Sequence, residues 1–207
     1  LIAPNLALKL APIVVTEAGF GADLGAEKFL DIASQEGNLH PDLVVMVATI
    51  RALKLHGGVL YEDLEKENVE ALREGLKNLQ QHLENISKFG MDFVVAINHF
   101  SSDSEAEIAC LSDYCRQKGY KFAFLDGFNK GGAGAVELAE EVIKALKENA
   151  SKYHPLYKKD EPIKEKIEKI CKEIYRADDV IYSDKALEQI ALYDKMGFSN
   201  SYICMAK

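Results

Sequence analysis

The run Phe93-Val94-Val95-Ala96-Ile97 is apolar at every position and rich in β-branched residues. A strand with one wet face alternates apolar and polar side chains, whereas a parallel strand buried on both faces forms a continuous apolar run. Three further runs have this character, at Ile13–Thr16, Leu43–Ala48 and Lys121–Leu125. The sequence therefore predicts one parallel sheet with strands at about 13–16, 43–48, 93–97 and 121–125.

Amphipathic segments separate these runs and predict helices on both faces of the sheet, an α/β fold. The helix between the third and fourth runs begins at Asp103 or Ser104, which are good N-cap residues, and ends at Gly119. The helix between the second and third runs extends from about Leu64 to Phe89. Its apolar stripe is formed by Leu72, Leu76, Leu79, Leu83 and Ile86. The third helix follows Gly134 and directs inward Val136, Ala139, Val142, Ile143 and Leu146.

The composition changes near Lys152, where a connector rich in Tyr, Pro and Lys begins. We expect residues 1–151 to be part of one α/β domain and residues 152–207 to form a smaller α/β module. The charged stretch Lys164–Lys172 is interpreted as a solvated helix face. The elements expected in the smaller module are helices at Ile163–Tyr175 and Asp184–Met196 and short strands at Val180–Tyr182 and Tyr202–Cys204.

Composition excludes several classes of protein. The formal net charge of −8 gives no basic surface for nucleic acid. No apolar run is long enough to span a membrane, and the first residues do not have the pattern of a secretory signal. We expect a cytoplasmic protein with reduced thiols, because no zinc or disulfide spacing is formed by Cys110, Cys115, Cys171 and Cys204.

In a parallel sheet, ligands bind beyond the carboxyl ends of the strands, so the loops there are the candidate sites. The first loop contains Glu17, Gly19, Gly21 and Asp23, whose glycines permit close backbone approach and whose carboxylates can hold a cation. A plain glycine-rich turn is the simpler alternative. The second loop supplies cations for an anionic substrate from Arg51, Lys54 and His56, unless they only form a short solvated helix that breaks at Gly57.

The third loop offers Asn98 and Asp103 to the edge of a base, and Phe100 to the face of a flat ligand. Helix capping alone also accounts for Asp103. The fourth loop presents Lys130, Gly131 and Gly132 ahead of a helix N-terminus, which suits an anion. It is not a Walker A loop, since no Gly-Lys-Ser or Gly-Lys-Thr occurs in the sequence.

Six motifs together resemble the formate–tetrahydrofolate ligases, in the order and at the spacing of that family. They are VVTEAGFGADLGAEKF at 14–29, ATIRALKLHGG at 48–58, VVAINHFSSDSEAE at 94–107, KGGAG at 130–134, IYRADDVIYS at 174–183 and CMAK at 204–207. The resemblance covers nearly the whole chain.

The resemblance implies that residues 1–151 are part of a nucleotide-binding domain with a P-loop-NTPase-like sheet. It also implies a reaction in which ATP phosphorylates formate and the formyl phosphate is captured by tetrahydrofolate. Mg²⁺, a monovalent cation and a homo-oligomer are implied as well. The residues beside phosphate and formate would be Glu17, Asp23 and Arg51, with the loop glycines Gly19 and Gly21. Those lining the nucleotide and folate cleft would be Asn98, Phe100, Asp103, Lys130, Gly131 and Gly132.

The match also departs from the family pattern. The family's P-loop and a basic formate-binding segment would precede this chain and further folate-contacting segments would follow it, so we expect a central piece that is inactive alone. Phe128-Asn129 stands where the family has a Trp-Ala-type pair, and Ser201-Tyr202 where Leu-Pro is usual. Two alternatives stay open: a non-catalytic remnant or interaction domain, and one subunit of a split ligase.

Overall fold

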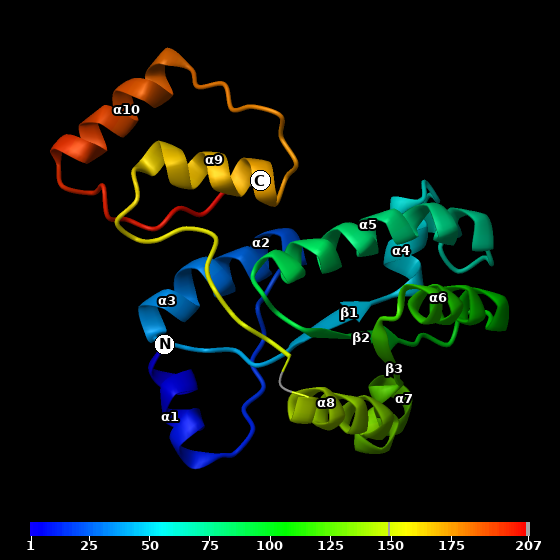
Figure 1. Cartoon of the computed structure of the whole chain (residues 1–207). Coiled ribbons are helices and arrows are strands. Elements are labelled where there is room, and N and C mark those ends of the chain that lie inside the picture. The colour runs from blue at the N-terminus through cyan, green and yellow to red at the C-terminus, as the bar shows by residue number, and fades with distance from the viewer. Residues whose placement is uncertain (149, 206–207) are drawn as a thin grey trace. The chain divides into compact units, whose positions relative to one another are not determined.

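Three of the apolar runs form one parallel sheet in the computed structural model of the chain, which describes residues 1–148 and 150–205 (Figure 1). The strands are β1 (Val44–Ala48), β2 (Phe93–Asn98) and β3 (Lys121–Leu125), in the order β1-β2-β3. Both pairings are parallel, with Ala48 opposite Ile97 and Asn98 opposite Leu125. The predicted α/β class and the three later strands are confirmed.

Helices flank this sheet on both sides, as the continuous apolar strands require. Figure 1 shows α4 (Ile50–His56), α5 (Val69–Lys88) and α6 (Glu105–Lys118) on one side and α8 (Val136–Glu148) on the other. In the central strand, Val94, Val95, Ala96 and Ile97 are all fully buried. The sheet therefore has cover on both faces at β2.

Local capping fixes where the long helices begin. Asn68 accepts a hydrogen bond from Ala71 N, so α5 begins after Asn68 rather than at the predicted Leu64. The segment before it contains a short 3-10 helix, η2 (Tyr61–Asp63). Helix α6 begins after Ser104, one of the two predicted caps, and its C-cap is Gly119 at φ +69°.

The core of this region follows the predicted stripe of α5, since Leu72, Leu76, Leu79, Leu83 and Ile86 are all buried. The prediction for α8 is wrong in part: Val136 and Ile143 are 52% and 43% exposed, and Ala145 is the buried position. Helix α8 contacts the sheet through β2 and β3. Its apolar stripe is wider than that contact, which leaves the flanks of the stripe in solvent.

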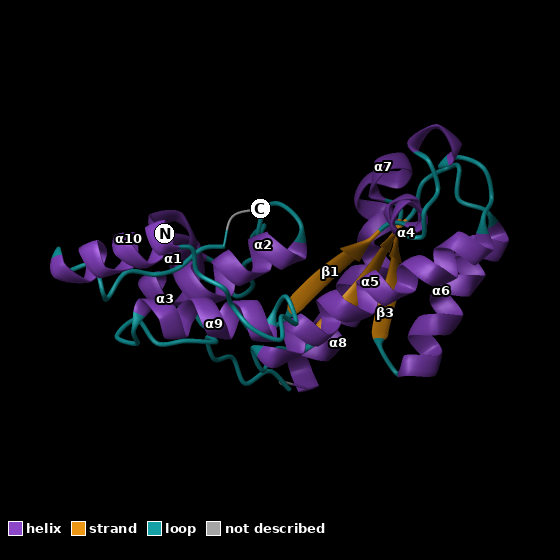
Figure 2. Cartoon of the chain, turned by 90° about the horizontal axis from the view of Figure 1, so that it is seen from above, coloured by secondary structure: helices purple, strands orange, loops and turns teal. Residues whose placement is uncertain are grey.

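The chain divides into two units. Unit 2 is Asp42–Lys152 and holds every strand of the described residues, drawn orange in Figure 2. Unit 1 combines Leu1–Pro41 with Tyr153–Lys207. Its helices are α1 (Ile2–Leu10), α2 (Ala22–Glu27), the π-helix η1 (Lys28–Ala33), α3 (Ser34–Gly37), α9 (Ile163–Glu173) and α10 (Asp184–Lys195).

Three predicted strands are absent from unit 1. Ile13–Thr16 has strand-like composition but no strand pairing, and the side chains of Ile13 and Val15 are 51% and 87% exposed. Val180–Tyr182 and Tyr202–Cys204 also lack strand structure. A β-rich composition favours extended backbone, but a strand also needs a partner to complete its hydrogen bonds. The described residues of unit 1 supply no such partner.

A buried lysine holds together parts of the second segment of unit 1, Tyr153–Lys207. The ammonium of Lys166 donates to three carbonyl oxygens, those of Lys159 at 2.6 Å and of Ser199 and Ser201 at 3.0 Å each. Lys166 is fully buried, so the prediction of a solvated face for Lys164–Lys172 is wrong at this position. A buried ammonium keeps its hydrogen bonds because leaving it unpaired is costly. The lysine therefore ties α9 to the segment after α10.

Two further contacts stabilise unit 1, and the second of them joins its two segments. The Tyr157 hydroxyl donates to Ile203 O at 2.9 Å and accepts from Ile203 N at 3.0 Å. The Tyr175 hydroxyl donates to Glu27 Oε2 at 3.0 Å, which links the end of α9 to α2. The predicted division into a nucleotide-binding part at 1–151 and a smaller module at 152–207 stays a prediction. No helix among the described residues has the length and apolar character to cross a membrane.

Candidate functional site

The carboxyl ends of the three strands meet at one edge of the unit 2 sheet, called here the carboxyl edge. Its loops follow Ala48, Asn98 and Leu125, which are the last residues of β1, β2 and β3. The loop after β2 is held to β3 because His99 N donates to Leu125 O at 2.9 Å. Parallel strands place such loops side by side, which is where ligands bind in open α/β sheets.

An arginine and an aromatic ring stack at this edge. The guanidinium carbon of Arg51, in the first turn of α4, lies 5.7 Å from the centre of the Phe100 ring, a cation–π distance. Phe100 is still 37% exposed, so part of the ring is open to solvent. Two residues that the sequence placed in separate loops are thus brought together.

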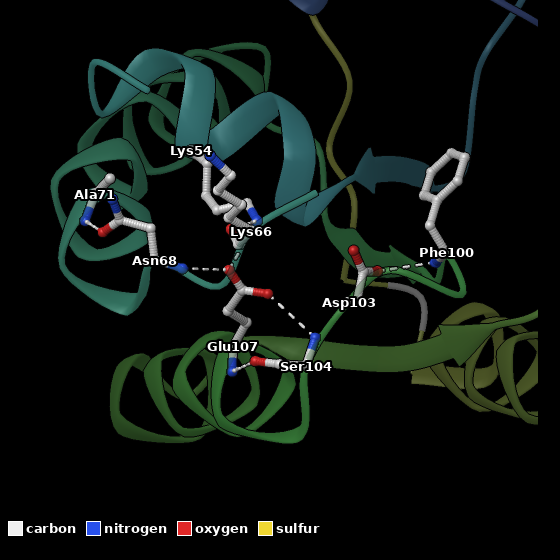
Figure 3. Close-up of polar contacts among 8 residues, drawn as sticks. All are labelled: Lys54, Lys66, Asn68, Ala71, Phe100, Asp103, Ser104 and Glu107. Carbon is white, nitrogen blue, oxygen red and sulfur yellow. Dashed lines mark hydrogen bonds and ion pairs between the residues drawn. The ribbon is translucent and has the colours of Figure 1, made fainter. Parts of the chain in front are cut away.

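Asp103 orients the backbone at Phe100 and has acceptor capacity left over. Its Oδ2 accepts from Phe100 N at 2.8 Å, as Figure 3 shows. Its Oδ1 is buried and accepts no hydrogen bond from any described residue. Burial raises the pKa of this carboxyl above its ordinary value, against the opposing effect of the Phe100 amide. A buried acceptor of this kind is suited to a ligand N–H or O–H group.

The loop after β3 contains a cluster that the sequence did not single out. Asp126 Oδ2 lies 3.0 Å from Lys130 Nζ, and Asp126 Oδ1 accepts from Asn129 Nδ2 at 2.7 Å. The hydrogen bond from Lys130 lowers the pKa of Asp126, and Asn129 adds to this effect. His99 Nδ1 lies 3.9 Å from Asp126 Oδ1. The Lys130 ammonium, which was predicted to bind an anion, is therefore paired with the Asp126 carboxylate.

The rest of this loop is open. Lys130 closes the short helix α7 (Gly127–Lys130), and the 3-10 helix η3 (Gly131–Ala135) follows. Gly131 has φ +57°, which favours glycine, and no atom lies within 4 Å of a Cβ placed at Gly131 or Gly132. Phe128 is 95% exposed. The backbone at Gly131 and Gly132 and the Phe128 ring are therefore accessible to a ligand.

The segment after β1 forms the alternative considered above, a short helix that ends at Gly57, and its three cations do not form one cluster. Lys54 is fully buried and pairs with Glu107 at 2.8 Å, whereas His56 is exposed at the end of α4. Lys54 lies on the buried side of α4 with Ile50 and Leu53. Of the three cations, Arg51 is the one that lies at the carboxyl edge.

The Glu17–Asp23 loop belongs to unit 1. Glu17 is exposed, Gly19 has φ +31°, Gly21 is the N-cap of α2 and Asp23 lies in the first turn of that helix. The Tyr175 hydroxyl oxygen, whose proton is donated to Glu27, also lies 3.0 Å from Asp23 O. A Cβ at Gly25 would lie 1.7 Å from Gly19 O, so the loop folds directly against its own helix.

Sequence reasoning missed Asp126, His99 and Glu107 as parts of this architecture. Asp126 directly follows β3, which is a signal that a search of strand ends could have used. The partnership of Glu107 with Lys54 spans more than fifty positions and has no local signature.

No group of three or more His, Cys, Asp or Glu among the described residues could hold a metal ion. A family model described as formate–tetrahydrofolate ligase matches residues 1–207 of the chain. The match includes every segment quoted above, although the last two residues of the motif at 204–207 lie outside the described residues.

Proposed function

Because the chain belongs to the formate–tetrahydrofolate ligase family, we propose that the carboxyl edge of unit 2 binds the flat rings of tetrahydrofolate or ATP. The reaction it serves is the ATP-dependent formylation of tetrahydrofolate to 10-formyltetrahydrofolate through formyl phosphate. The observation that carries this assignment is the pairing of the partly exposed Phe100 ring with Asp103 Oδ1, a buried acceptor that has no hydrogen-bond donor.

A flat heterocycle has the two properties that this pair recognises. Its face can stack on the exposed part of Phe100, and its N–H groups can donate to Asp103 Oδ1. Asp103 Oδ2 holds the Phe100 amide, so the ring and the acceptor are fixed relative to each other by one 2.8 Å hydrogen bond. Both pterin and adenine carry such donors, and affinity measurements separate the two.

Charge at the edge suits an anionic ligand. Arg51 forms no ion pair with a carboxylate of the described residues and lies against Phe100, where it can meet a carboxylate or phosphate of a ligand. Lys130 is paired with the Asp126 carboxylate. We therefore propose that it contacts the ligand beside Gly131 and Gly132 rather than at phosphate oxygens. Mg²⁺ would arrive with the nucleotide, because this ion is commonly held by phosphates and only one or two carboxylates.

The roles of Glu17 and Asp23 are proposed separately, since these residues lie in unit 1. In the family reading their carboxylates act beside formate and phosphate, and the loop glycines Gly19 and Gly21 allow close backbone approach. Glu17→Gln and Asp23→Asn should each lower turnover in an assay that contains ATP, Mg²⁺, K⁺, formate and tetrahydrofolate, with the family's P-loop segment added in trans.

Calorimetric titration of the 207-residue chain tests the assignment of the edge. Tetrahydrofolate and Mg²⁺·ATP are titrated separately. Phe100→Ala should weaken binding of the ligand that stacks there by roughly tenfold. Asp103→Asn, which places an N–H₂ group near the position of a carboxylate oxygen, should weaken it by about tenfold as well.

Phe198→Ala is the matched control, because Phe198 is a 50% exposed phenylalanine in unit 1. Its affinity should equal that of the wild type. If Phe100→Ala and Asp103→Asn bind both ligands as tightly as the control does, the carboxyl edge is not the binding site.

A further inference from the structure

A buried ion pair lies behind the carboxyl edge. Lys54 Nζ and Glu107 Oε1 are 2.8 Å apart, and their side chains are 1% and 0% exposed. Lys54 Nζ also donates to Lys66 O at 2.9 Å. Glu107 Oε1 accepts from Asn68 N at 2.8 Å, and Asn68 in turn caps the first turn of α5 (Figure 3). The pair thus connects α4, α6 and the segment that enters α5.

The second carboxylate oxygen of Glu107 is connected to the candidate site. Oε2 accepts from Ser104 N at 3.1 Å, and the Ser104 hydroxyl accepts from Glu107 N at 3.2 Å, which is a reciprocal capping box. Ser104 follows Asp103, whose Oδ2 holds the Phe100 amide. Two hydrogen bonds, connected through the peptide bond between Asp103 and Ser104, therefore link the buried pair to Phe100.

The other partner, Lys54, is linked to the same ring through helix α4. Lys54 lies one helical turn after Arg51, so anchoring Lys54 fixes the first turn of α4. Arg51 in turn lies over Phe100 at 5.7 Å. The two ends of the ion pair thus fix the two residues that stack at the edge.

Stability alone is a weak reason for such a pair. Desolvating two charges costs about as much as their attraction returns, and well-packed neutral replacements are often neutral or stabilising. Positioning of the helix starts is a better explanation. The Glu107 carboxylate accepts hydrogen bonds from two backbone amides at helix starts, and it also pairs with the Lys54 ammonium.

We propose that Lys54 and Glu107 are positioning residues whose buried contact holds Arg51 and Phe100 in the arrangement that receives the ligand. Neither side chain touches the ligand, since both are buried. The expected effect on ligand affinity rests on the proposed function, whereas the expected effect on Phe100 does not.

The test is the double variant Lys54→Met and Glu107→Gln, which removes both charges and nearly keeps both shapes. Its control is Lys77→Met with Glu74→Gln, the same chemistry at an exposed pair on α5. Amide hydrogen exchange by NMR reports the site, with Ala96 in buried β2 as the internal reference. In the double variant, Phe100 N should exchange at least ~10-fold faster while Ala96 N keeps its wild-type rate.

Affinity for tetrahydrofolate or Mg²⁺·ATP should fall by roughly tenfold in the same variant and stay unchanged in the control. Wild-type rates at Phe100 would overturn the positioning role. Equal acceleration at Phe100 and Ala96 would overturn it too, since it would indicate a general loss of stability. If the wild-type chain binds neither ligand, the proposed function fails, and the exchange rates still decide the positioning role.

A second variant decides the matter if the double variant does not fold. Glu107→Asp keeps the charge beside Lys54, but it is one methylene too short to reach both Lys54 Nζ and Ser104 N. Phe100 N should exchange ~3-fold faster or more, with Ala96 unchanged. An unaltered Phe100 rate in folded Glu107→Asp would overturn the proposal.

Discussion

Leu53 and Gly75 are in direct backbone contact: a Cβ atom added at Gly75 would lie only 1.9 Å from Leu53 O. Gly57 makes a similar approach, since a Cβ atom added there would lie 1.8 Å from Ala71 O. Helices α4 and α5 therefore pack without side chains between them at these points. This close packing sets where the first turn of α4, and with it Arg51, can lie.

Gly75→Ala should destabilise unit 2 although alanine favours a helix by ~1 kcal/mol over glycine. The added methyl group has no space, so we expect the free energy of unfolding to fall by about 2 kcal/mol or more. Urea unfolding followed by far-UV circular dichroism measures the change. Gly132→Ala is the control, because the space around Gly132 is open, and its effect should stay within roughly 0.5 kcal/mol. Equal stability of the two variants would refute the close packing.

Lys166→Met should be costly in unit 1. The substitution removes the donor to three carbonyl oxygens while leaving those oxygens in place. We expect a loss of about 2–4 kcal/mol in the free energy of unfolding. Lys172→Met, an exposed lysine on the same helix, should change it by less than about 0.5 kcal/mol. Comparable midpoints for the two variants in thermal unfolding would rule out this role for Lys166.

Asp31 should make the stability of unit 1 depend on pH. Burial, with a smaller contribution from Glu27, raises the pKa of Asp31 from 3.8 to about 7, although Leu156 N donates to its carboxylate at 2.7 Å. The folded state then binds more protons than the unfolded chain between these two values. The free energy of unfolding should therefore fall as the pH rises through that window and level off above about 7.

Asp31→Asn, which stays neutral, should flatten that slope and be more stable than the wild type at alkaline pH by roughly 2–4 kcal/mol. Urea unfolding at a series of pH values measures both effects. Asp160→Asn, at an exposed position, should keep the wild-type slope. An Asp31→Asn variant with the wild-type slope would show that other groups cause the dependence.

The sequence predicted those parts of the fold whose determinants are local. The continuous apolar runs identified β1, β2 and β3, and Ser104 was one of the two residues predicted to cap the start of α6. Ile13–Thr16 was predicted wrongly because its composition favours extended backbone whether or not a neighbouring strand is present.

The site could be predicted only in part for the same reason. Strand ends indicated the loops that carry Arg51, Phe100 and Lys130, because parallel strands have one carboxyl edge. The burial of Lys54 and Lys166 could not be foreseen, since each depends on acceptors far away in the chain. A lysine in a charged helix is normally solvated, and only tertiary contacts reverse that expectation.

The most direct test of the binding assignment is an NMR titration of the isotopically labelled 207-residue chain with tetrahydrofolate and, separately, with Mg²⁺·ATP. At least one of the two ligands should shift the backbone amides of residues 98–103 and 126–132 together, with a single saturating dependence on its concentration. Phe100→Ala should shift the curve to higher concentration. Saturable shifts confined to other residues, or none with either ligand, would contradict the assignment of the carboxyl edge as the binding site.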